Sequence, residues 1–531
     1  MRKTCSAAFL LCWGLCLAQA QQPAEEQPVD LLLAGGEVVD GSGSAPRRAD
    51  VGIRGDRIVF IGDAAKARLR AVRTVSAQGL IVAPGFIDPH THAGDDLSST
   101  ERNSNLNYLM QGVTTVIVGN DGGGSPHPEK ALKLWDEQGI GTNAALLVGH
   151  GAVRREVLGP GDVQPSSAQL AQMKALVRSA MQEGAFGLST GLFYAPGSFA
   201  RTEEVVELAK PAAELGGIYD SHMRDEDSYS IGLLGSIRET IRIGREAKLP
   251  VHISHIKALG PEVWGQSVQA IAIIRKARAE GIKVTADQYP YTASGSSLDA
   301  SLLPRWAQAG DRDKVLARLT DPGVRPRLLE EMRKNLRHRG GANSLLLTSG
   351  EISELRGKRL AAIAKQRNQP PVEAALDLII EATKNRRAGA LATASFNMSD
   401  ADVERFMKQG FVMTGSDGSP GHPRKYGTYP RKLREYVYKK KLITLPFAIH
   451  ASSAQVAEFL HIPERGLLRE GYFADVIVFD PATVADRATY ENPQELAAGM
   501  KYVLVNGKPA VDDGRFTGTL AGRALRRRPR N

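Results

Sequence analysis

The chain has 531 residues, of which 42% are hydrophobic and 24% charged, so it can form one large domain and a smaller one with a substantial core. Part of its formal net charge of +10 comes from a short basic run at residues 523–530 rather than from a broad basic face. The sequence offers neither aromatic stacking platforms nor a basic recognition helix, and we therefore expect no nucleic-acid partner.

The first twenty residues have the layout of a secretory signal peptide. Arg2 and Lys3 precede an apolar run at residues 7–17, and residues 18–20, Ala-Gln-Ala, supply a cleavage pattern of small residues. The apolar run is too short to span a bilayer comfortably. We therefore expect cleavage after Ala20, a periplasmic or secreted protein, and no membrane association of the mature chain.

The three cysteines of the chain, Cys5, Cys12 and Cys16, all fall inside this predicted signal peptide. The mature protein would therefore contain no disulfide and no thiolate metal ligand. A chain without thiols suits an oxidising compartment, where a stray thiol is a liability.

Both ends of the mature chain have the texture of short strands joined by glycine and aspartate turns, after a polar leader at residues 21–28. The strands are expected at residues 30–40, 50–62, 73–77, 471–480 and 503–514. Within the last of these, Asn506 and Gly507 form a type I′ hairpin signal. We expect one small β-sandwich built from both termini, from residues 21–82 and 466–531.

The middle of the chain alternates short β-branched apolar runs with helical stretches, which indicates βα units around a parallel sheet. Eight candidate strands end near His90, Gly119, Gly149, Ser189, His222, His255, Gln288 and Asp417. Eight such strands close a TIM (β/α)8 barrel, which we expect within residues 83–465. The gap between the last two strands is too long for one crossover helix, so we predict a largely helical insertion at about 300–400.

Two histidines follow the buried apolar run at residues 80–83. In an extended segment, residues two apart point to the same side, so His90 and His92 can close on one cation while Thr91 faces away. Taken alone, such a pair is more simply read as two histidines in a polar loop.

Further residues of ligand type stand at the ends of other predicted strands: Asp121, His222, His255 and Asp417. Each of them alone is more often a turn former, a helix cap or a buried imidazole. TIM barrels carry their active sites at the carboxyl ends of the strands, however, and imidazole and carboxylate are both ligands of Zn²⁺. Together these residues predict a divalent metal site at that end of the barrel.

The segment at residues 85–92, Gly-Phe-Ile-Asp-Pro-His-Thr-His, resembles the first motif of the amidohydrolase superfamily. Motifs similar to those of the D-aminoacylase (N-acyl-D-amino-acid deacylase) family stand at residues 149–154, 187–197, 221–226, 253–257, 289–294, 415–418 and 422–427. The resemblance implies a β-sandwich with a metal-bearing barrel. It also implies hydrolysis of the amide of N-acyl-D-amino acids, which releases a carboxylate and a D-amino acid.

Position by position, the resemblance implies four histidine metal ligands: His90, His92, His222 and His255. It implies that Asp417 is the general base and acid at strand eight. The family typically has a cysteine as the strand-two ligand, whereas this chain has Asp121, a harder ligand that can still bind or bridge metals. We expect one or two divalent ions, with Zn²⁺ as the first choice.

The expected mechanism follows from the chemistry of amides. A bound divalent ion polarises the carbonyl and lowers the pKa of a water towards about 7. Asp417 would take the proton from this water and pass it to the leaving amine.

The carboxylate of the product amino acid requires a cationic partner in the pocket. Lys257, two residues past His255, is the first candidate, although a solvated lysine at a strand end explains it equally well. Tyr289 is the second candidate, by the family resemblance, and Arg224 and Arg424 are weaker ones.

Three alternatives share parts of this pattern. A dipeptidase or another amidase on the same scaffold is the nearest, because Asp121 replaces the cysteine of the family. A cyclic-amide hydrolase or deaminase would use the same metal chemistry. A non-catalytic binding protein is disfavoured because a pure binder has no need of a proton shuttle such as Asp417.

Overall fold

We describe the protein from a computed structural model, in which residues 28–349, 353–385 and 391–527 are described. The predicted signal peptide, its cleavage point after Ala20 and nearly all of the polar leader lie outside these residues. Within them, no helix is both long and apolar enough to cross a membrane.

Both ends of the described chain contribute strands to one β-domain, as the sequence predicted, and the described strands of this domain pair as one continuous sheet. Its amino-terminal strands are β1 (Pro28–Val38), β2 (Arg47–Arg54), β3 (Arg57–Gly62), β4 (Arg70–Ser76) and β5 (Ile81–Pro84). Its carboxyl-terminal strands are β18 (Val476–Phe479), β19 (Met500–Val505), β20 (Lys508–Asp512) and β21 (Arg515–Phe516). The two sets join where β18 pairs with β5 in antiparallel fashion, and apolar side chains from both ends, such as Leu33, Val51 and Val478, share one buried cluster.

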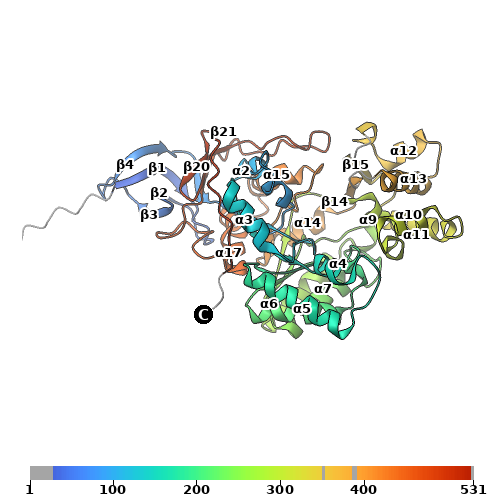
Figure 1. Cartoon of the computed structure of the whole chain (residues 1–531). Helices are drawn as coiled ribbons and strands as arrows, with labels where there is room; N and C mark the ends of the chain where they lie inside the picture. The colour runs from blue at the N-terminus through green and yellow to red at the C-terminus, as the bar shows by residue number, and fades with distance from the viewer. Residues whose placement is uncertain (1–27, 350–352, 386–390, 528–531) are drawn as a thin grey trace, which may run out of the picture.

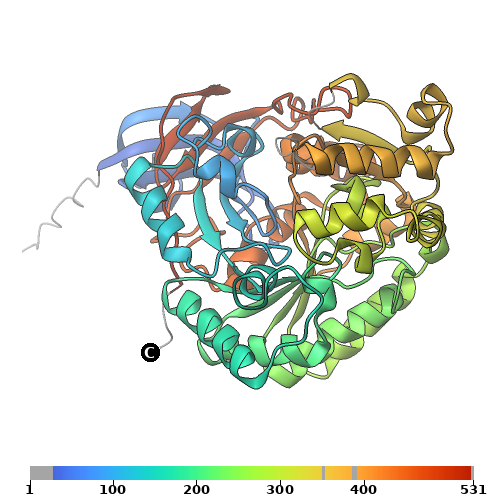
Figure 2. The ribbon, with the colours of Figure 1, turned by 45° about the vertical axis from the view of Figure 1, so that its right-hand side comes forward.

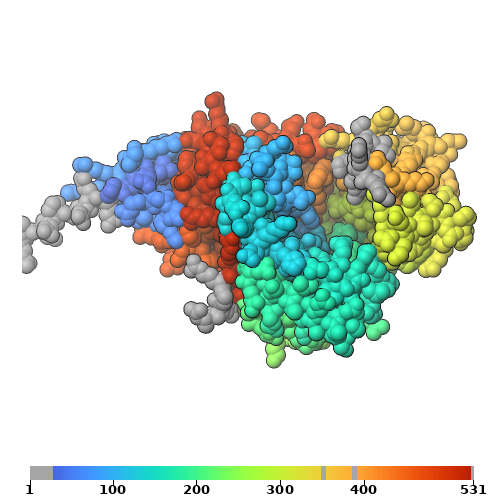
Figure 3. Space-filling view, in the orientation of Figure 1, coloured from blue at the N-terminus to red at the C-terminus, as the bar shows by residue number. Residues whose placement is uncertain are grey.

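The carboxyl-terminal strands lie between the amino-terminal strands and the rest of the molecule. The space-filling view shows the red end of the chain in this position, with the blue strands outside it (Figure 3). This sheet forms one end of the molecule, and the insertion described below forms the other (Figure 1).

In the described ranges, eight parallel strand positions form the barrel, which confirms the predicted fold class. They are β6 (Phe86–Asp88), β7 (Val113–Val118), β8 (Asn143–Leu146) with β9 (Val148–Gly149), β10 (Gly187–Gly191), β11 (Ile218–His222), β12 (Val251–Ile253), β13 (Val284–Gln288) and β17 (Val412–Thr414). Strand β8 pairs in the group β6, β7 and β8, and β9 pairs in the group β9 to β13 and β17. Only Leu147 separates β8 from β9, so the chain joins the two groups at this point. A parallel bridge from Thr91 to Gly418 closes the ring between the first and the last strand.

Amphipathic helices surround the barrel strands (Figure 2). The longer ones are α3 (Pro128–Gln138), α4 (His150–Leu158), α5 (Ser167–Gln182), α6 (Thr202–Glu214), α7 (Gly232–Ala247), α8 (Ser267–Ala279) and α14 (Asp400–Met407). The start of helix α5 is encoded in its sequence, because Ser166 and Gln169 form a reciprocal capping box there. Helices cover the outer face of the barrel and side chains fill its interior, so the strands are buried on both faces, as in β7.

Shorter elements complete the barrel domain and its rim. They are α1 (Gly94–Leu97), α2 (Leu106–Leu109), η1 (Gly197–Phe199), η2 (Pro261–Val263), α15 (Arg424–Arg431), the π-helix η5 (Lys432–Lys439), α16 (Leu445–Ala451) and α17 (Ala454–Leu460).

The insertion between β13 and β17 has its own small core and contains strands as well as helices. Its elements are β14 (Ala293–Ser297), α9 (Leu298–Leu302), η3 (Arg305–Gln308), α10 (Arg312–Thr320), α11 (Arg325–His338), β15 (Leu345–Ser349), η4 (Ser353–Leu355), α12 (Leu360–Gln366), α13 (Pro371–Lys384) and β16 (Ala392–Phe396). Among the described residues, β14, β16 and β15 pair as an antiparallel sheet. The expected helical content is present, and the sheet is an addition that the sequence analysis did not predict.

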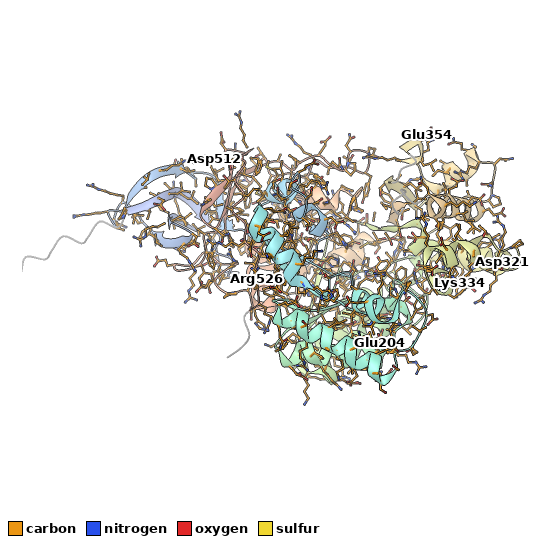
Figure 4. All side chains as sticks on the ribbon, in the orientation of Figure 1. Glu204, Asp321, Lys334, Glu354, Asp512 and Arg526 are labelled. Atoms are coloured by element: carbon orange, nitrogen blue, oxygen red, sulfur yellow. The ribbon has the colours of Figure 1, made fainter. Side chains whose placement is uncertain are left out.

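The described part of the basic carboxyl-terminal run packs on the barrel instead of extending into solvent. Ala524 forms a parallel bridge with Ala144 of β8, and Gly522 an antiparallel one with Ile140. Arg526 reaches Asp136 of α3 across 2.6 Å (Figure 4). These contacts hold the end of the described chain against the outside of the barrel.

Candidate metal centre

The His-x-His pair lies at the carboxyl end of β6, with the geometry that its spacing predicted. The backbone N–H of His90 donates to Asp88 Oδ1 across 3.2 Å. The Thr91 hydroxyl donates to the carbonyl oxygen of Ile117 across 2.7 Å, so this side chain turns away from the two imidazoles. The ring centroids of His90 and His92 are 5.7 Å apart.

Asp121 lies at the centre of the four histidines. Its Oδ1 is 3.4 Å from His90 Nε2, and its Oδ2 is 3.4 Å from His92 Nε2. The same Oδ1 is 3.5 Å from His222 Nδ1 and 3.6 Å from His255 Nε2. Strands that are far apart in sequence, β6, β11 and β12, therefore deliver imidazoles to one carboxylate that follows β7.

Asp417 completes the cluster from the end of β17. Its Oδ1 is 3.1 Å from His92 Nε2 and 3.7 Å from His90 Nε2. Its Oδ2 is 2.9 Å from Arg424 Nη1, in a buried ion pair. One carboxylate oxygen of Asp417 thus faces the histidines, and the other faces a guanidinium.

Three of the clustered residues have left-handed backbone conformations, which non-glycine residues rarely adopt. The φ angles are 56° at Asp121, 37° at His255 and 46° at Asp417. Such conformations persist only where the surrounding structure holds them, and they concentrate at functional sites.

The glycine-rich loop that carries Asp121 is held against the neighbouring strand by close backbone contacts. A Cβ at Gly124 would overlap the carbonyl oxygen of Leu147, and one at Gly149 would overlap that of Gly122. The absence of side chains at these positions therefore lets the loop approach the strand closely enough to aim Asp121 at the histidines.

Several buried polar atoms in this cluster have no hydrogen-bond partner among the described residues. They are both ring nitrogens of His90, both ring nitrogens of His222, and Asp121 Oδ1. Buried polar groups are normally paired, so this set indicates a missing partner. Nitrogen and carboxylate oxygen are the donors with which Zn²⁺ and similar ions are bound, and the cluster fits such an ion.

The donor atoms fall into two groups that share one residue. His90, His92, Asp121 and Asp417 form the first group, and Asp121, His222 and His255 form the second; within each group the donor atoms lie within 4.8 Å of one another. This arrangement fits a centre of two ions with Asp121 between them.

Electrostatics within the cluster favour positive charge. Burial and the neighbouring Lys257 disfavour the protonated form of His255, yet nearby carboxylates, led by Glu226 and Asp417, outweigh them and raise the pKa of His255 to about 9. Burial opposes the charged form of Asp121 as well, but His90 and the other imidazoles hold its pKa well below the usual range. The carboxylates that favour protonation of the imidazoles would also attract a bound metal cation.

Lys257 is a buried member of the site and not a solvated strand-end lysine. Its side chain is 3% exposed, and its Nζ lies 2.6 Å from Glu226 Oε1 and 2.7 Å from His255 Nδ1. Glu226 in turn lies 3.0 Å from His255 Nδ1. The sequence analysis did not single out Glu226, although it stands in the motif at residues 221–226.

A second carboxylate that the sequence analysis missed lies beneath the histidines. Asp287 Oδ1 accepts from the backbone N–H of His255 across 2.9 Å and is 3.0 Å from His252 Nε2. It also lies 3.8 Å from His90 Nδ1. Asp287 is the next-to-last residue of β13, so the only signal for it was its place near a strand end.

The four predicted substrate-binding residues lie in different environments. Lys257 and Arg424 both line the cavity in front of the histidines. Tyr289 is 1% exposed and lies beneath Arg424, whose guanidinium is 4.6 Å from the ring centroid, so it supports the wall without forming it.

The expectation for Arg224 was wrong. Its guanidinium lies 2.8 Å from Glu239 Oε1 and donates to the carbonyl oxygens of Ser198 and Ala200, so its donors are used inside the protein. It does not line the cavity. Arg224 holds the loop after β10 to helix α7.

The cavity in front of the cluster has a volume of about 950 Å³, which suits a small organic molecule. Asp121, His222, His255 and Asp417 line its floor. Its walls also include residues that the sequence analysis did not name: Phe193, Tyr194, Glu226, Ser296, Arg339 and His422. Ser296 and Arg339 come from the insertion, which therefore closes one side of the cavity.

The fold and this cluster together define a class of protein: a TIM-barrel metallohydrolase with a β-domain built from both chain ends. Residues 73–511 match the family model described as "Amidohydrolase family". The chain belongs to this family and, within it, to the D-aminoacylases. It is 37% identical to a D-aminoacylase of Alcaligenes xylosoxydans xylosoxydans, over 95% of this chain and 99% of that protein.

Other relatives extend this picture. The chain is 34% identical to an N-acyl-D-glutamate deacylase of Alcaligenes xylosoxydans xylosoxydans, over 91% of this chain and 93% of that protein. A crystal structure of D-aminoacylase superposes with a TM-score of 0.80 at 34% identity, over 94% of this chain and all of that one. The N-acyl-D-glutamate deacylase from Bordetella bronchiseptica, solved with zinc and a phosphonate inhibitor, superposes with a TM-score of 0.78 at 32% identity, over the same shares.

Proposed function

We propose that the protein is a metal-dependent deacylase of N-acyl-D-amino acids, releasing a carboxylate and a D-amino acid. The observation that carries this proposal is the convergence of four imidazoles on Asp121 within 3.6 Å, with Asp417 beside them. The relatives named D-aminoacylase and N-acyl-D-glutamate deacylase support the reaction and the substrate class. Its partners would be small N-acyl amino acids, and we infer no nucleic-acid partner.

The residues that would hold the metal are His90, His92, Asp121, His222 and His255. A divalent ion bound there supplies a Lewis acid that polarises the amide carbonyl and makes a water a better nucleophile near neutral pH. Zn²⁺ is our first choice because the donor set is nitrogen and carboxylate oxygen. Asp121, in place of the cysteine typical of the family, is a harder ligand and favours oxygen-preferring ions more than a thiolate would.

Asp417 is our candidate general base and acid. Its Oδ1 faces the histidine cluster, whereas Arg424 neutralises the other oxygen across 2.9 Å. Burial opposes ionisation, but Arg424 and the imidazoles outweigh it and hold the pKa of Asp417 well below its usual range, so the side chain is the ionised carboxylate that a general base must be. The accepted proton then passes to the leaving amine.

Lys257 and Arg424 are our candidates for binding the substrate carboxylate. Both are cations in the cavity wall. Lys257 Nζ is 2.7 Å from His255 Nδ1, and Arg424 Nη1 is 2.9 Å from Asp417 Oδ2. A carboxylate bound between them would hold the amide in front of the donor cluster, where the reaction takes place. Arg224 is no longer a candidate.

A substrate panel tests this proposal. We expect turnover of N-acetyl-D-amino acids by zinc-loaded protein and little turnover of the L-enantiomers. If only L-dipeptides, or only cyclic amides, were hydrolysed, the deacylase proposal would be replaced by the dipeptidase or cyclic-amide alternative. Lack of turnover of any of these compounds by protein with full zinc content would favour a binding protein.

We also propose that the protein is exported to the periplasm or secreted, with cleavage after Ala20. The support is the pattern of residues 1–20, a basic start followed by an apolar run and a small-residue cleavage pattern. Amino-terminal sequencing of protein expressed from the full chain tests this proposal. We expect the mature protein to begin at Gln21, and an intact Met1 in cytoplasmic fractions alone would contradict it.

A further inference from the structure

A second group of possible metal ligands lies outside the catalytic cavity, where the insertion meets the barrel. Asp227 belongs to the loop after β11, Glu262 to the short helix η2 after β12, and His338 is the last residue of α11 in the insertion. One donor atom from each of the three lies within 4.8 Å of the others. The His338 Nδ1 atom is 3.4 Å from Glu262 Oε2 and 3.9 Å from Asp227 Oδ2.

Ser228 adds a fourth oxygen at the centre of this group. Its hydroxyl lies 2.6 Å from Glu262 Oε2, 3.1 Å from His338 Nδ1 and 3.3 Å from Asp227 Oδ1. The hydroxyl has one proton for three acceptors. Two carboxylate oxygens and one imidazole nitrogen therefore surround this hydroxyl.

A buried carboxylate oxygen that faces this group has no partner. Asp227 has no exposed surface, and its Oδ2 has no hydrogen-bond partner among the described residues. Buried polar atoms without partners are costly and uncommon, so this one requires an explanation.

Charged groups of both signs surround these side chains. Asp225, Asp227 and Glu262 all lie near one another, and both Asp225 and Glu262 act electrostatically on Asp227. Arg339 is the cation that acts most strongly on Asp227. Lys334 and Arg337 on α11 act on His338 as positive charges, and Glu262 and Asp225 act on it as negative ones. Lys334 projects from α11 at the outer side of the insertion (Figure 4).

The backbone around the group is closely fitted. Gly260 has a φ of 102°, and a Cβ there would overlap both Asp227 Oδ2 and the carbonyl oxygen of His338. Because residue 260 has no side chain, the loop after β12 can approach the other two segments closely. Three segments that are distant in sequence are held within reach of one ion.

We propose that Asp227, Ser228, Glu262 and His338 bind a divalent transition-metal ion, such as Zn²⁺ or Mn²⁺, that fastens the insertion to the barrel. One imidazole nitrogen with carboxylate and hydroxyl oxygens is a donor set of this class of ion. The site shares no residue with the catalytic cluster, and it is independent of the proposed reaction.

The position of this site links it to the cavity wall. The His338 ring lies 4.8 Å from that of Tyr229, Tyr229 lies 5.7 Å from Phe193, and Phe193 lines the cavity. Arg339, which follows His338 directly, also lines the cavity. An ion that fixes the end of α11 would therefore fix the insertion side of the cavity.

Metal content measured by mass spectrometry tests the proposal. The full-length protein is saturated with Zn²⁺, desalted, and compared with the variants Glu262→Gln, His338→Gln and Asp227→Asn. We expect each variant to hold one equivalent of zinc per chain fewer than the unchanged protein. Glu262→Gln is the mildest variant, because its side chain is 56% exposed and its loss should not impair folding.

Glu330→Gln on the same helix α11 is the matched control, since Glu330 is exposed and lies about two helical turns before His338. It should keep the full zinc content. Amide hydrogen exchange supplies the second readout: exchange in α11 should rise on His338→Gln in the presence of zinc and stay unchanged in the control. Equal zinc content in the unchanged protein and all three variants, with equal exchange in α11, would overturn the proposal.

Discussion

Asp417 has two contacts with different chemical consequences, the imidazole of His92 at 3.1 Å and the guanidinium of Arg424 at 2.9 Å. The first places a carboxylate oxygen at the donor cluster, and the second neutralises the charge of the other oxygen. An amide in place of the carboxylate would keep much of this packing but could not accept a proton.

We therefore predict that Asp417→Asn keeps the fold and lowers kcat by about 10²- to 10⁴-fold, the usual contribution of a general acid–base group. The measurement is steady-state turnover of an N-acetyl-D-amino acid, with circular dichroism to check folding. Asp513→Asn is the control, because Asp513 is exposed in the terminal sheet domain. Turnover of Asp417→Asn within a factor of two of the unchanged protein would remove Asp417 from this role.

Two arginines that the sequence could not distinguish should respond differently to removal. Arg424→Met should raise KM by roughly 10- to 100-fold, since the carboxylate of the substrate would lose a cationic hydrogen-bond partner. Arg224→Met should leave KM unchanged and lower the free energy of unfolding by about 3 kcal/mol, because it leaves Glu239 without its partner.

Kinetic assays and denaturant unfolding measure these two effects. The opposite pattern, with KM raised by the Arg224 variant and stability alone lowered by the Arg424 variant, would reverse the assignment. The difference arises from a contact that the sequence does not reveal, because Glu239 is fifteen residues away on helix α7.

At the scale of elements, the loop after β7 decides where Asp121 points. Gly124 and Gly123 are neighbours in this loop but differ in surroundings. A Cβ at Gly124 would overlap the carbonyl oxygen of Leu147, whereas one at Gly123 would meet only Asn120 O at 3.5 Å, an ordinary contact.

Gly124→Ala should therefore destabilise the protein by about 1–3 kcal/mol, the usual cost of overpacking, and should reduce activity because Asp121 is displaced. Gly123→Ala should be close to neutral in both respects. Thermal unfolding and turnover of the two purified variants measure the difference. Equal stability of the two would show that the loop does not hold Asp121 through this contact.

The sequence predicted the strand ends well and the connections poorly. Barrel strands such as β7 are short β-branched runs whose ends could be read directly, and His90, His222, His255 and Asp417 were predicted to lie together because each stands at a predicted strand end. The antiparallel sheet of the insertion depends on pairing between β14, β15 and β16, which are separated by helices, and sequence periodicity does not report such pairing.

Buried charged partners were also beyond prediction. Glu226 and Asp287 became site residues only once their distances to His255 and His252 were known. The sequence likewise does not show that the basic segment near the carboxyl end runs beside β8 and reaches α3.

At the scale of the whole molecule, metal binding and stability should be coupled. An ion that binds the folded chain and not the unfolded chain adds roughly 2.7 kcal/mol of stability at about one hundred times its Kd. Removal of metal by a chelator should therefore abolish turnover and lower Tm, and added Zn²⁺ should restore both. Calorimetry and turnover of the same samples measure this coupling, and full turnover by metal-free protein would contradict it.

The central claim is that four histidines and Asp121 bind divalent metal at the mouth of the barrel. Anomalous diffraction at the zinc edge, from crystals of zinc-loaded protein, tests it most directly. We predict one or two peaks with ligand distances of about 2.0–2.2 Å, at least one of them bounded by Asp121, His222 and His255. Fully active crystals without any anomalous peak within reach of Asp121 would contradict the claim.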